Sequence, residues 1–453
     1  MSSGKKPLLD VDLENIIGRM GGPSVAQPRS ARSGGRGQMT SFESHPLYRQ
    51  MVEHRRFGSR TQFADPHYRL HDGAAGAVTS IEGVERLNFA SYDYLNLNRH
   101  PLILQAVDEA GRKFGTSVSA SRISAGERTV HSELETALAS VYEAEAAVAF
   151  VSGHGAIVST LATLMGPKDL IIFDALSHNC IVMGAKLAGA ARRSFPHNDF
   201  AAVDAILEEE RDRFERVMIV SEGLFSMDGD GPDLARLIEI KRRHGAIIMI
   251  DDAHGLGVLG RSGRGIFEHQ GVNPLDVDLW AGTLSKALVS CGGYVAGSRV
   301  VIDILKHHAP GFVYSVGLPA GVAVAATTAL KIMFSEPERV AALQARSHRF
   351  HAKAISMGLD VATSWGVGII PVIVGDPVRT VALSQRLLER NINTFPVLPP
   401  GVPDGSARIR FFISAAHSEE QIDHAVETFV TELDAVKTVS VAQLLGSPTA
   451  LRP

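Results

Sequence analysis

Ala281-Gly-Thr-Leu-Ser-Lys286-Ala-Leu places one lysine in a run of small and apolar residues. Such neighbours solvate a charge poorly, and desolvation favours the neutral amine over the ammonium form. A neutral lysine amine can attack a carbonyl carbon and form a Schiff base. The stretch therefore predicts that Lys286 is a reactive residue and that the rest of the chain supports it.

A second motif lies upstream of this lysine. Ala246-Ile-Ile-Met-Ile-Asp251-Asp-Ala-His254 is a short pattern typical of a buried strand, and it ends in two carboxylates and a histidine. Asp251 and His254 are three residues apart, so both can face one pocket from the end of the strand. A strand-end aspartate and a Schiff-base lysine are what a pyridoxal phosphate (PLP) site needs, because the aspartate keeps the pyridine nitrogen protonated and the ring then withdraws electrons.

The composition is that of an ordinary globular protein. With 453 residues, 45% of them hydrophobic and 21% charged, the chain can form one large domain and a smaller one. The formal net charge of -4 gives no indication of nucleic acid as a partner. Two cysteines cannot form a disulfide framework and no secretory signal is visible, so we expect a reducing, cytoplasmic location. The longest apolar stretch, 317–334, is interrupted by polar residues, which predicts a buried helix and no membrane span.

Changes of pattern along the chain predict five segments. They are an N-terminal extension at 1–45, an arm at 46–95, a large PLP-binding domain at 96–335, a small C-terminal domain at 336–440 and a loose tail at 441–453. The extension combines an amphipathic helix around Leu9–Met20 with a flexible linker rich in Gly, Ser, Pro and Arg. It is either a tethered helix that docks on an acyl carrier or a second subunit, or a tail that packs on its own domain or stays disordered. A single amphipathic repeat favours the tail.

The middle of the chain alternates short apolar runs with helical patterns. The runs lie at Ala146–Val151, Leu170–Phe173, Arg216–Val220, Ala246–Ile250, Leu279–Trp280 and Gly293–Ala296. This alternation predicts an α/β fold with a mostly parallel central sheet and helices on both faces, followed after Pro337 by a smaller α+β domain. Since ligands bind beyond the carboxyl ends of parallel strands, polar residues that follow an apolar run are candidate site residues.

Three further motifs follow predicted strands. Ser152-Gly153-His154-Gly155 joins a strand to a helix, and its backbone N–H groups either hold a phosphate or simply form a tight turn. His178 is either a residue that stacks on a cofactor ring and guides proton transfer or a histidine of a polar loop. Glu222 and Ser226 could hydrogen-bond a ring hydroxyl or position a neighbour, whereas Asp228-Gly-Asp230-Gly is typical of a turn.

Two other interpretations of the region around His254 carry less weight. Gly255-Leu-Gly257-Val-Leu-Gly260 matches the glycine pattern of dinucleotide sites, but Asp251-Asp-Ala-His separates it from the strand and no helix follows it. Asp252 and His254 could in principle ligate a metal. No second cluster of His or Cys has ligand spacing, so we expect no metal.

The predicted C-terminal domain carries two candidate arginines. Arg408 and Arg410 lie two residues apart on a strand pattern, so they face the same side. Either could bind a substrate carboxylate through two parallel hydrogen bonds while the other pairs with a neighbour. Spacing alone does not choose between them.

Taken together, the motifs resemble the α-oxoamine synthase family of fold-type I PLP enzymes, which includes serine palmitoyltransferase and 8-amino-7-oxononanoate synthase. The resemblance covers about residues 85–430. It rests on the ordered set Ser91-Tyr-Asp-Tyr-Leu, Ser119-Ala-Ser-Arg-Ile-Ser-Ala-Gly, Ser152-Gly-His, Asp174-Ala-Leu-Ser-His, Glu222-Gly-Leu-Phe-Ser-Met-Asp-Gly, Asp251-Asp-Ala-His, Gly282-Thr-Leu-Ser-Lys and Arg408-Ile-Arg-Phe-Phe-Ile-Ser-Ala-Ala-His. As an ordered set it is highly specific.

The resemblance implies a role for each candidate residue. The catalytic residues would be Lys286 as the Schiff-base lysine, His178 stacked on the ring, Asp251 at the pyridine nitrogen and His254 at the ring hydroxyl. Further contacts to the cofactor would come from Gly153, His154, Glu222, Ser226, Thr283, Ser285 and Ser315. Arg410 matches the arginine that binds the substrate carboxylate, and Tyr92 would also contact the substrate.

Three positions depart from the family pattern. His154 stands where Phe or Tyr is common, which is tolerable because the backbone holds the phosphate. Val316 and Gly317 replace two hydroxyl residues in a segment that reaches the phosphate across the dimer interface, so Ser315 or nothing takes that part. Tyr92 stands where the biotin-pathway synthase typically has Asn. Serine palmitoyltransferases resemble this sequence more at that point, which favours a longer acyl donor.

The resemblance also implies a homodimer with a shared active site and a decarboxylative condensation. A small L-amino acid (serine, alanine or glycine) would react with an acyl thioester, carried by coenzyme A or by an acyl-carrier protein, to give an α-amino ketone. The expected enzyme is a PLP-dependent acyltransferase similar to serine palmitoyltransferase, an enzyme of sphingolipid biosynthesis. The alternatives are an 8-amino-7-oxononanoate synthase of the biotin pathway, an aminotransferase of the same fold, and a non-catalytic partner subunit.

Overall fold

The computed structural model describes residues 42–52, 63 and 65–446, which belong to two compact units, Met1–Arg55 and Arg56–Pro453. The described part of the first unit consists of η1 (Phe42–Ser44) and helical backbone at 46–52. The predicted amphipathic helix and linker of the extension lie outside the described residues, as does the chain after 446. Every other element belongs to the second unit.

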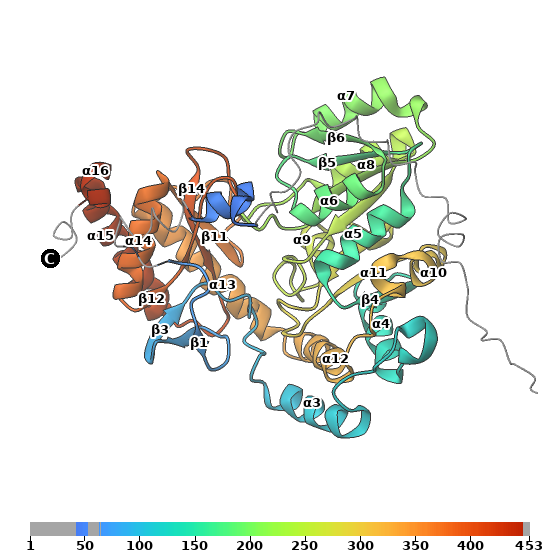
Figure 1. Cartoon of the computed structure of the whole chain (residues 1–453), viewed down its shortest axis with the longest axis horizontal. Coiled ribbons are helices and arrows are strands. Elements are labelled where there is room, and N and C mark those ends of the chain that lie inside the picture. The colour runs from blue at the N-terminus through green and yellow to red at the C-terminus, as the bar shows by residue number, and fades with distance from the viewer. Residues whose placement is uncertain (1–41, 53–62, 64, 447–453) are drawn as a thin grey trace, which may run out of the picture. The chain divides into compact units, whose positions relative to one another are not determined.

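A seven-stranded sheet formed by strands between residues 146 and 297 lies within the second unit (Figure 1). Its strand order is β4-β10-β9-β8-β7-β5-β6. The strands are β4 (Ala146–Phe150), β5 (Leu170–Asp174), β6 (Ala191–Phe195), β7 (Val217–Glu222), β8 (Ile247–Asp251), β9 (Leu279–Thr283) and β10 (Gly293–Gly297). Strands β5 to β9 pair in parallel, and β10 pairs antiparallel with both of its neighbours. The prediction of a mostly parallel sheet is confirmed.

One strand of this sheet was not predicted. β6 has the sequence Ala-Arg-Arg-Ser-Phe and lies at the edge of the sheet, where Phe195 is its one fully buried side chain. An edge strand keeps polar residues on its solvent side, so β6 lacks the continuous apolar run that marks β7 and β8.

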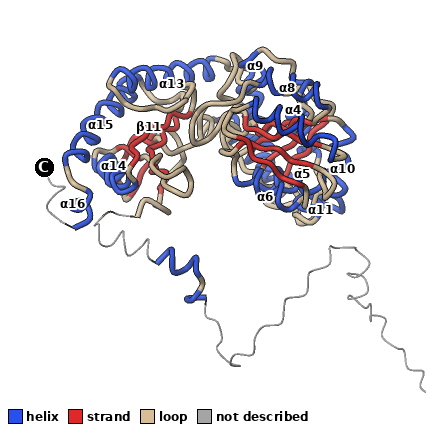
Figure 2. The backbone as a smooth tube through the Cα atoms, turned by 90° about the horizontal axis from the view of Figure 1, so that it is seen from above, coloured by secondary structure: helices blue, strands red, loops and turns tan. Residues whose placement is uncertain are grey.

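Helices cover both faces of the sheet, as predicted (Figure 1, Figure 2). Side chains alternate between the faces along each strand, so Ile248 and Ile250 belong to one apolar cluster and Met249 to the other. The first cluster includes side chains of α3 (Pro101–Phe114), α4 (Thr129–Val141), α7 (Phe200–Glu210), α8 (Leu234–His244), α9 (Ile266–Gln270) and α12 (Ala320–Ser335). The second includes side chains of α5 (Gly153–Leu164), α6 (Asn179–Leu187), α10 (Arg299–His308) and α11 (Pro310–Val313). Short turns η3 (Arg211–Arg213) and η4 (Pro274–Asp276) precede β7 and β9.

The longest apolar stretch of the sequence forms the buried helix that was predicted. It corresponds to α12, which packs against α3 and α4. Among the residues that the structure describes, no helix is long and apolar enough to cross a membrane.

The C-terminal part has its own three-stranded sheet in the order β11 (Ile369–Gly375), β14 (Ala407–Phe412) and β13 (Phe395–Val397). The helices that pack with it are α13 (Glu338–Ser356), α14 (Pro377–Glu389) and α15 (Glu419–Thr438). Ser418 and Gln421 form a capping box at the start of α15. The prediction of a loose tail from 441 is wrong at its start, because α16 (Val441–Gly446) is helical and buries Leu444 in the core.

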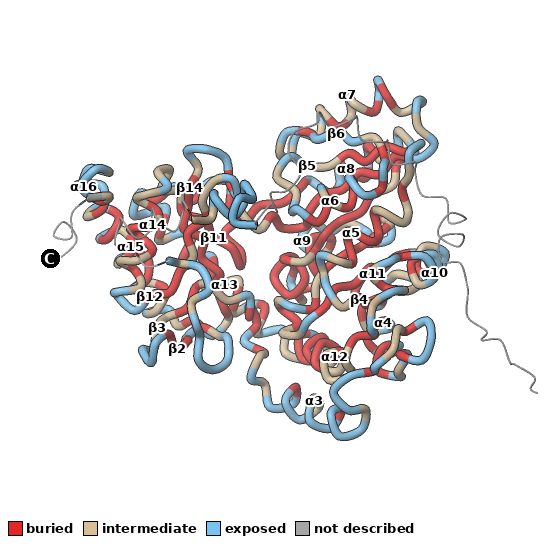
Figure 3. Tube along the Cα trace, in the orientation of Figure 1, coloured by how far each residue is buried: buried red, intermediate tan, exposed pale blue. Residues whose placement is uncertain are grey.

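The N-terminal arm pairs with a strand of the C-terminal part. β1 (His71–Asp72), β2 (Val78–Ile81) and β3 (Val84–Asn88) form antiparallel neighbours, and β3 pairs in parallel with β12 (Ile392–Asn393). Buried residues, red in Figure 3, follow the strands and the inner faces of the helices. The arm is thereby held against the C-terminal part by backbone hydrogen bonds.

Candidate active site

A cavity of about 370 Å³ lies at the carboxyl ends of β7, β8 and β9. With the exception of Ser315, it is lined by every residue that the sequence analysis assigned to the site: Tyr92, Gly153, His154, His178, Glu222, Ser226, Asp251, His254, Thr283, Ser285, Lys286 and Arg410. Its wall also includes residues that the sequence analysis did not select: Ser152, Ile157, Cys180, Met227, Ala253 and Gly282. The parallel register sets Glu222 beside Asp251 and Asp251 beside Ala281, which brings these strand ends together.

Lys286 lies in the turn that follows β9 and lines the cavity. Burial lowers the pKa of Lys286 to about 8, while the carboxyl groups of Asp251 and Glu222 act in the opposite direction. A group with such a pKa can gain or lose a proton close to neutral pH. The structure therefore gives the lysine the environment that its small and apolar neighbours in the sequence indicate.

Two buried carboxyl groups lie near this lysine. Asp251 ends β8, and its Oδ1 accepts a hydrogen bond from the N–H of Ala253 at 3.1 Å. Burial raises the pKa of Asp251, although Lys286 and His178 lower it. Burial and the neighbouring Asp251 raise the pKa of Glu222 to about 8. A cation placed in this cavity would favour the ionised form of Asp251.

His178 is the N-cap residue of α6 and is fixed at two points. Its backbone N–H donates to Oε1 of Glu222 at 2.6 Å. Its ring nitrogen Nδ1 lies 2.9 Å from Sγ and 3.3 Å from the backbone nitrogen of Cys180. Burial lowers the pKa of His178, although Asp251 raises it. Glu222 was considered either as a partner of a ring hydroxyl or as a residue that positions a neighbour. Its hydrogen bond to His178 is a contact of the second kind.

His254 is buried, and its ring is held by a residue that the sequence analysis did not select. The hydroxyl of Tyr94 lies 2.8 Å from Nδ1 of His254. Burial, together with Lys286 and Arg410, lowers the pKa of His254 well below its usual value, so the imidazole is neutral. Tyr92 lies edge-on to the same ring at a centroid distance of 5.9 Å. Tyr94 belongs to the same sequence motif as Tyr92, so the sequence contained a feature that could have identified it.

The start of α5 forms a corner suited to an anion. Ser152 caps this helix through a hydrogen bond from the N–H of Gly155, and the first N–H groups of a helix have no partner within it. A Cβ at Gly153 would lie 3.1 Å from Oγ1 of Thr283, so glycine lets the helix start approach the end of β9. The hydroxyl oxygens of Thr283 and Ser285 lie 2.7 Å apart. Helix N-termini of this kind bind phosphate groups.

The two arginines of β14, Arg408 and Arg410, differ in their tertiary contacts. Arg408 Nη1 donates to Oδ1 of Asp228 at 2.6 Å, so Asp228 is an ion-pair partner and not merely the turn residue that its motif suggests. Arg410 lines the cavity, and its Nη1 donates to the carbonyl of Ser226 at 2.7 Å. Its Nε is buried without a hydrogen-bond partner. Of the two arginines, Arg410 is therefore the one that lines the cavity.

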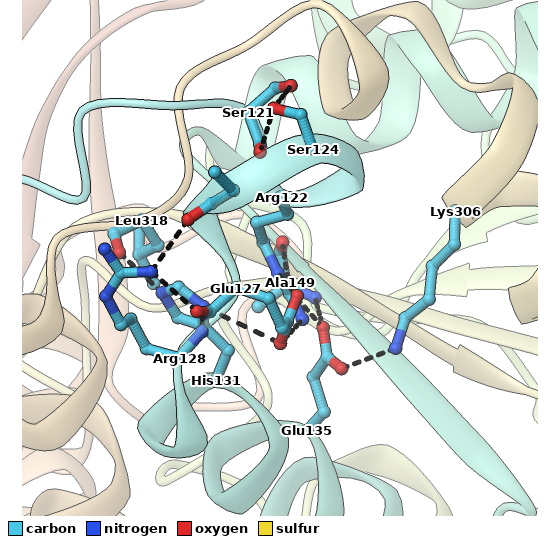
Figure 4. A network of polar contacts seen from close by, with 11 residues as sticks. Ser121, Arg122, Ser124, Glu127, Arg128, His131, Glu135, Ala149, Lys306 and Leu318 are labelled. Carbon is cyan, nitrogen blue, oxygen red and sulfur yellow. Dashed lines mark hydrogen bonds and ion pairs between the residues drawn. The ribbon is translucent and has the colours of Figure 1, made fainter.

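Ser315 does not line the cavity of a single chain. It lies in the segment after α11, where the N–H of Gly317 donates to the carbonyl of Ala120 at 2.9 Å. This contact anchors the segment beside η2 (Arg122–Gly126), a single π-type turn. Figure 4 shows the ion pairs that hold the turn, which join Arg122 to Glu127 and Glu135. The role of Ser315 at a phosphate stays a prediction.

A second cavity, of about 420 Å³, adjoins the first at Lys286. Tyr92, Ser285 and Lys286 line both cavities. The other walls of the second cavity come from residues between 71 and 98 and from Val289 and Ser290 in the loop after Lys286. Lys286 therefore borders two adjoining cavities.

Comparison with known proteins places these features in context. The model of the family "Aminotransferase class I and II" matches residues 84–429. The 8-amino-7-oxononanoate synthase of Symbiobacterium thermophilum is 39% identical over 349 residues, which are 77% of this chain and 88% of that protein. The solved structure of Sphingomonas wittichii serine palmitoyltransferase has a TM-score of 0.84 and 29% identity, and the match covers 88% of this chain and 100% of that chain. A serine palmitoyltransferase solved with PLP matches with a TM-score of 0.83 and 26% identity, over 88% of this chain and 100% of its own.

Proposed function

This chain belongs to the aminotransferase class I and II family, in its α-oxoamine synthase branch, and from that premise we propose that it condenses a small L-amino acid with an acyl thioester. The reaction forms a carbon–carbon bond between the amino acid Cα and the acyl carbonyl carbon. It releases the thiol and carbon dioxide and leaves an α-amino ketone. The observation that carries the proposal is that Lys286 and Asp251 line one cavity at the ends of two adjacent parallel strands.

Pyridoxal phosphate is the cofactor whose groups the residues of the cavity fit. Asp251 would hold the pyridine nitrogen, and Lys286 would hold the aldehyde carbon. The start of α5, with the hydroxyls of Thr283 and Ser285, would hold the phosphate. When bound, PLP supplies an electron sink for the carbon that carries the amine. Since burial raises the pKa of Asp251, a protonated ring nitrogen beside it would restore its ionised form.

Lys286 is the group that we expect to take the proton from Cα. Its pKa of about 8 is close to neutral pH, which suits a residue that both accepts and returns a proton. Burial lowers the pKa of His178 and of His254 below their usual value, so both histidines are weaker bases than the lysine. Both would instead orient the bound groups by stacking and by hydrogen bonds.

Arg410 is the group that we expect to bind the carboxylate of the amino acid. Arg410 lines the same cavity as Lys286. A carboxylate accepts two parallel hydrogen bonds from a guanidinium, which fixes the direction of the Cα substituents. Arg408 is paired with Asp228 and does not line this cavity.

Two members of the family, 8-amino-7-oxononanoate synthase and serine palmitoyltransferase, are the candidates, and they differ in their substrates. The identity of this chain with the Symbiobacterium thermophilum 8-amino-7-oxononanoate synthase exceeds its identity with either serine palmitoyltransferase structure. This supports the alternative of the sequence analysis, alanine with a short dicarboxylic acyl donor, better than its first choice of serine with a long acyl chain. Serine with a long acyl chain remains the second candidate. It is supported by Tyr92, where the sequence resembles serine palmitoyltransferases more, and by the fold match to those enzymes.

We also propose that the enzyme is a homodimer in which each subunit completes the site of the other. Tyr314 and Val316, which flank Ser315, are 80% and 49% exposed in the single chain. Large apolar side chains exposed together are typical of protein interfaces. In such a dimer Ser315 would contact the phosphate in the partner's site. The acyl group would arrive on coenzyme A or on an acyl-carrier protein.

Visible absorption spectroscopy tests the proposed function. The purified protein is supplied with PLP and titrated separately with glycine, alanine and serine, with Lys286→Ala as the control because it lacks the amine that anchors PLP. We expect a visible band whose change saturates with one amino acid. Alanine would favour the 8-amino-7-oxononanoate synthase reading and serine the serine palmitoyltransferase reading. A wild-type protein without a visible band after addition of PLP would overturn the proposal.

A further inference from the structure

Cys180 contacts one ring nitrogen of His178 twice. The backbone nitrogen of Cys180 lies 3.3 Å from Nδ1 of His178, and its Sγ lies 2.9 Å from the same atom. His178 is the N-cap of α6 and Cys180 follows two residues later, a spacing at which a cap side chain accepts from the backbone of the first turn. Cys180 is 1% exposed and lines the cavity that contains Lys286.

The backbone contact decides which nitrogen of His178 carries a proton. A backbone N–H only donates, so Nδ1 must be the acceptor and cannot carry a hydrogen itself. The proton of the neutral imidazole therefore lies on Nε2. The thiol must be the donor in the second contact. Burial, with the charges of Asp251 and Glu222, raises the pKa of Cys180, so the S–H proton is retained.

We propose that Cys180 is a positioning residue that holds His178 neutral, with its proton on Nε2. A second proton would have to enter at Nδ1 and would break both contacts to Cys180. His178 then acts in the cavity as a hydrogen-bond donor and a stacking surface, while the Cα proton is left to Lys286. The inference rests on the proposed function and adds to it the protonation state of one site residue.

Burial lowers the pKa of His178 and favours the neutral ring, and charged groups around the ring add smaller effects. Asp251 raises the pKa of the imidazole, whereas Lys286 and His154 lower it. The carboxyl of Glu222 accepts from the backbone N–H of His178 and not from its ring. Among the groups that face His178, Cys180 contributes the two donors directed at Nδ1.

The first test measures the thiol in the protein without PLP. The sequence has two cysteines, and Cys291→Ser removes the exposed one, so the infrared S–H stretching band then reports Cys180 alone. We expect this band at a lower frequency than in the same protein with His178→Phe, because donation of the S–H to nitrogen weakens the S–H bond. Equal frequencies in the two proteins would overturn the proposed contact.

The second test follows the titration of His178 by nuclear magnetic resonance of histidine-labelled protein without PLP. Comparison with His178→Phe identifies its signal, which we expect to be that of the Nε2–H tautomer. Cys180→Ala should raise the pKa of His178 by about 0.5–1 unit, since one hydrogen bond to the neutral ring is lost. Cys180→Ser should restore the wild-type value, because a hydroxyl can donate to the same nitrogen.

Two results of this titration would overturn the inference: an Nδ1–H tautomer, or a wild-type pKa in Cys180→Ala. Failure of the wild-type protein to bind PLP would count against the proposed function instead. Neither the infrared nor the resonance measurement uses the cofactor, so the two failures are distinguishable.

Discussion

Glu222 accepts a hydrogen bond from the backbone N–H of His178, with 2.6 Å between Oε1 and the nitrogen. Glu222 is the last residue of β7, and His178 directly precedes α6. The bond therefore joins the carboxyl end of β7 to the start of α6. The same carboxyl interacts with Asp251 and Lys286, and burial raises its pKa to about 8. Glu222 therefore affects both the position of the histidine and the charge around the lysine.

Glu222→Gln should reduce the pH dependence of stability. The pKa of Glu222 in the folded protein, about 8, lies above its ordinary value of 4.5, so the folded state binds the proton more tightly than the unfolded state. The contribution of this group is therefore fully present below pH 4.5 and is lost as the pH rises to 8. Glutamine keeps an acceptor for the N–H of His178 but does not ionise. Melting curves across this window test the prediction, and an equal decrease in both proteins would contradict it.

Arg410→Met should weaken binding of the amino acid, whereas Arg408→Met should lower the stability of the fold. Loss of Arg410 should raise the KM for the amino acid by about 10–100-fold, the value of hydrogen bonds to a charged group. Loss of Arg408 leaves the carboxylate of Asp228 without its partner in a poorly solvated place, which should cost about 3 kcal/mol of stability. Steady-state kinetics and denaturant unfolding measure the two effects. The assignment fails if Arg410→Met loses the stability and Arg408→Met loses the affinity.

Gly255→Ala should destabilise the fold. A Cβ at Gly255 would lie 1.8 Å from Oδ1 of Asp252, whose side chain is fully buried. Relief of this overlap requires a shift of packed atoms at a cost of about 1–3 kcal/mol. The glycine thus serves packing against Asp252, and no nucleotide is needed to explain it.

Gly111→Ala in α3 is the matched control for this substitution. A Cβ at Gly111 would meet nothing within 4 Å, and alanine favours a helix over glycine. We expect the melting temperature to fall for Gly255→Ala and to stay or rise for Gly111→Ala. Similar shifts for the two variants would show that Asp252 does not require a glycine at 255.

Val289 carries backbone strain close to the reactive lysine. Its φ is 42°, which is rare for a β-branched residue, and its N–H closes a turn on the carbonyl of Lys286 at 2.9 Å. Both Val289→Gly and Val289→Ala remove the valine packing, but only glycine relieves the strain. We expect the glycine variant to be more stable than the alanine variant by about 1 kcal/mol. Denaturant unfolding of the pair measures this, and the opposite order would mean that the turn is unstrained.

Much of the fold was predictable because secondary structure has a local pattern. The apolar run before Asp251 and the capping residues Ser418 and Gln421 identify β8 and the start of α15 from their immediate neighbours. Lys286 could be selected in the same way, from the small residues on either side of it. Short strands such as β12 and β13 have too few residues for a pattern of alternation, and they were not predicted.

The remaining features depend on segments that are remote in the chain. Arg408 and Arg410 share one face of β14, and only Asp228 and Ser226, which lie opposite them in the fold, distinguish the paired arginine from the one at the cavity. Likewise, burial lowers the pKa of Lys286, and the carboxyl groups of Asp251 and Glu222, which raise it, are brought together by the pairing of β7 with β8. Periodicity records which face a side chain occupies, but the partner across from it is set by long-range packing, which no local pattern encodes.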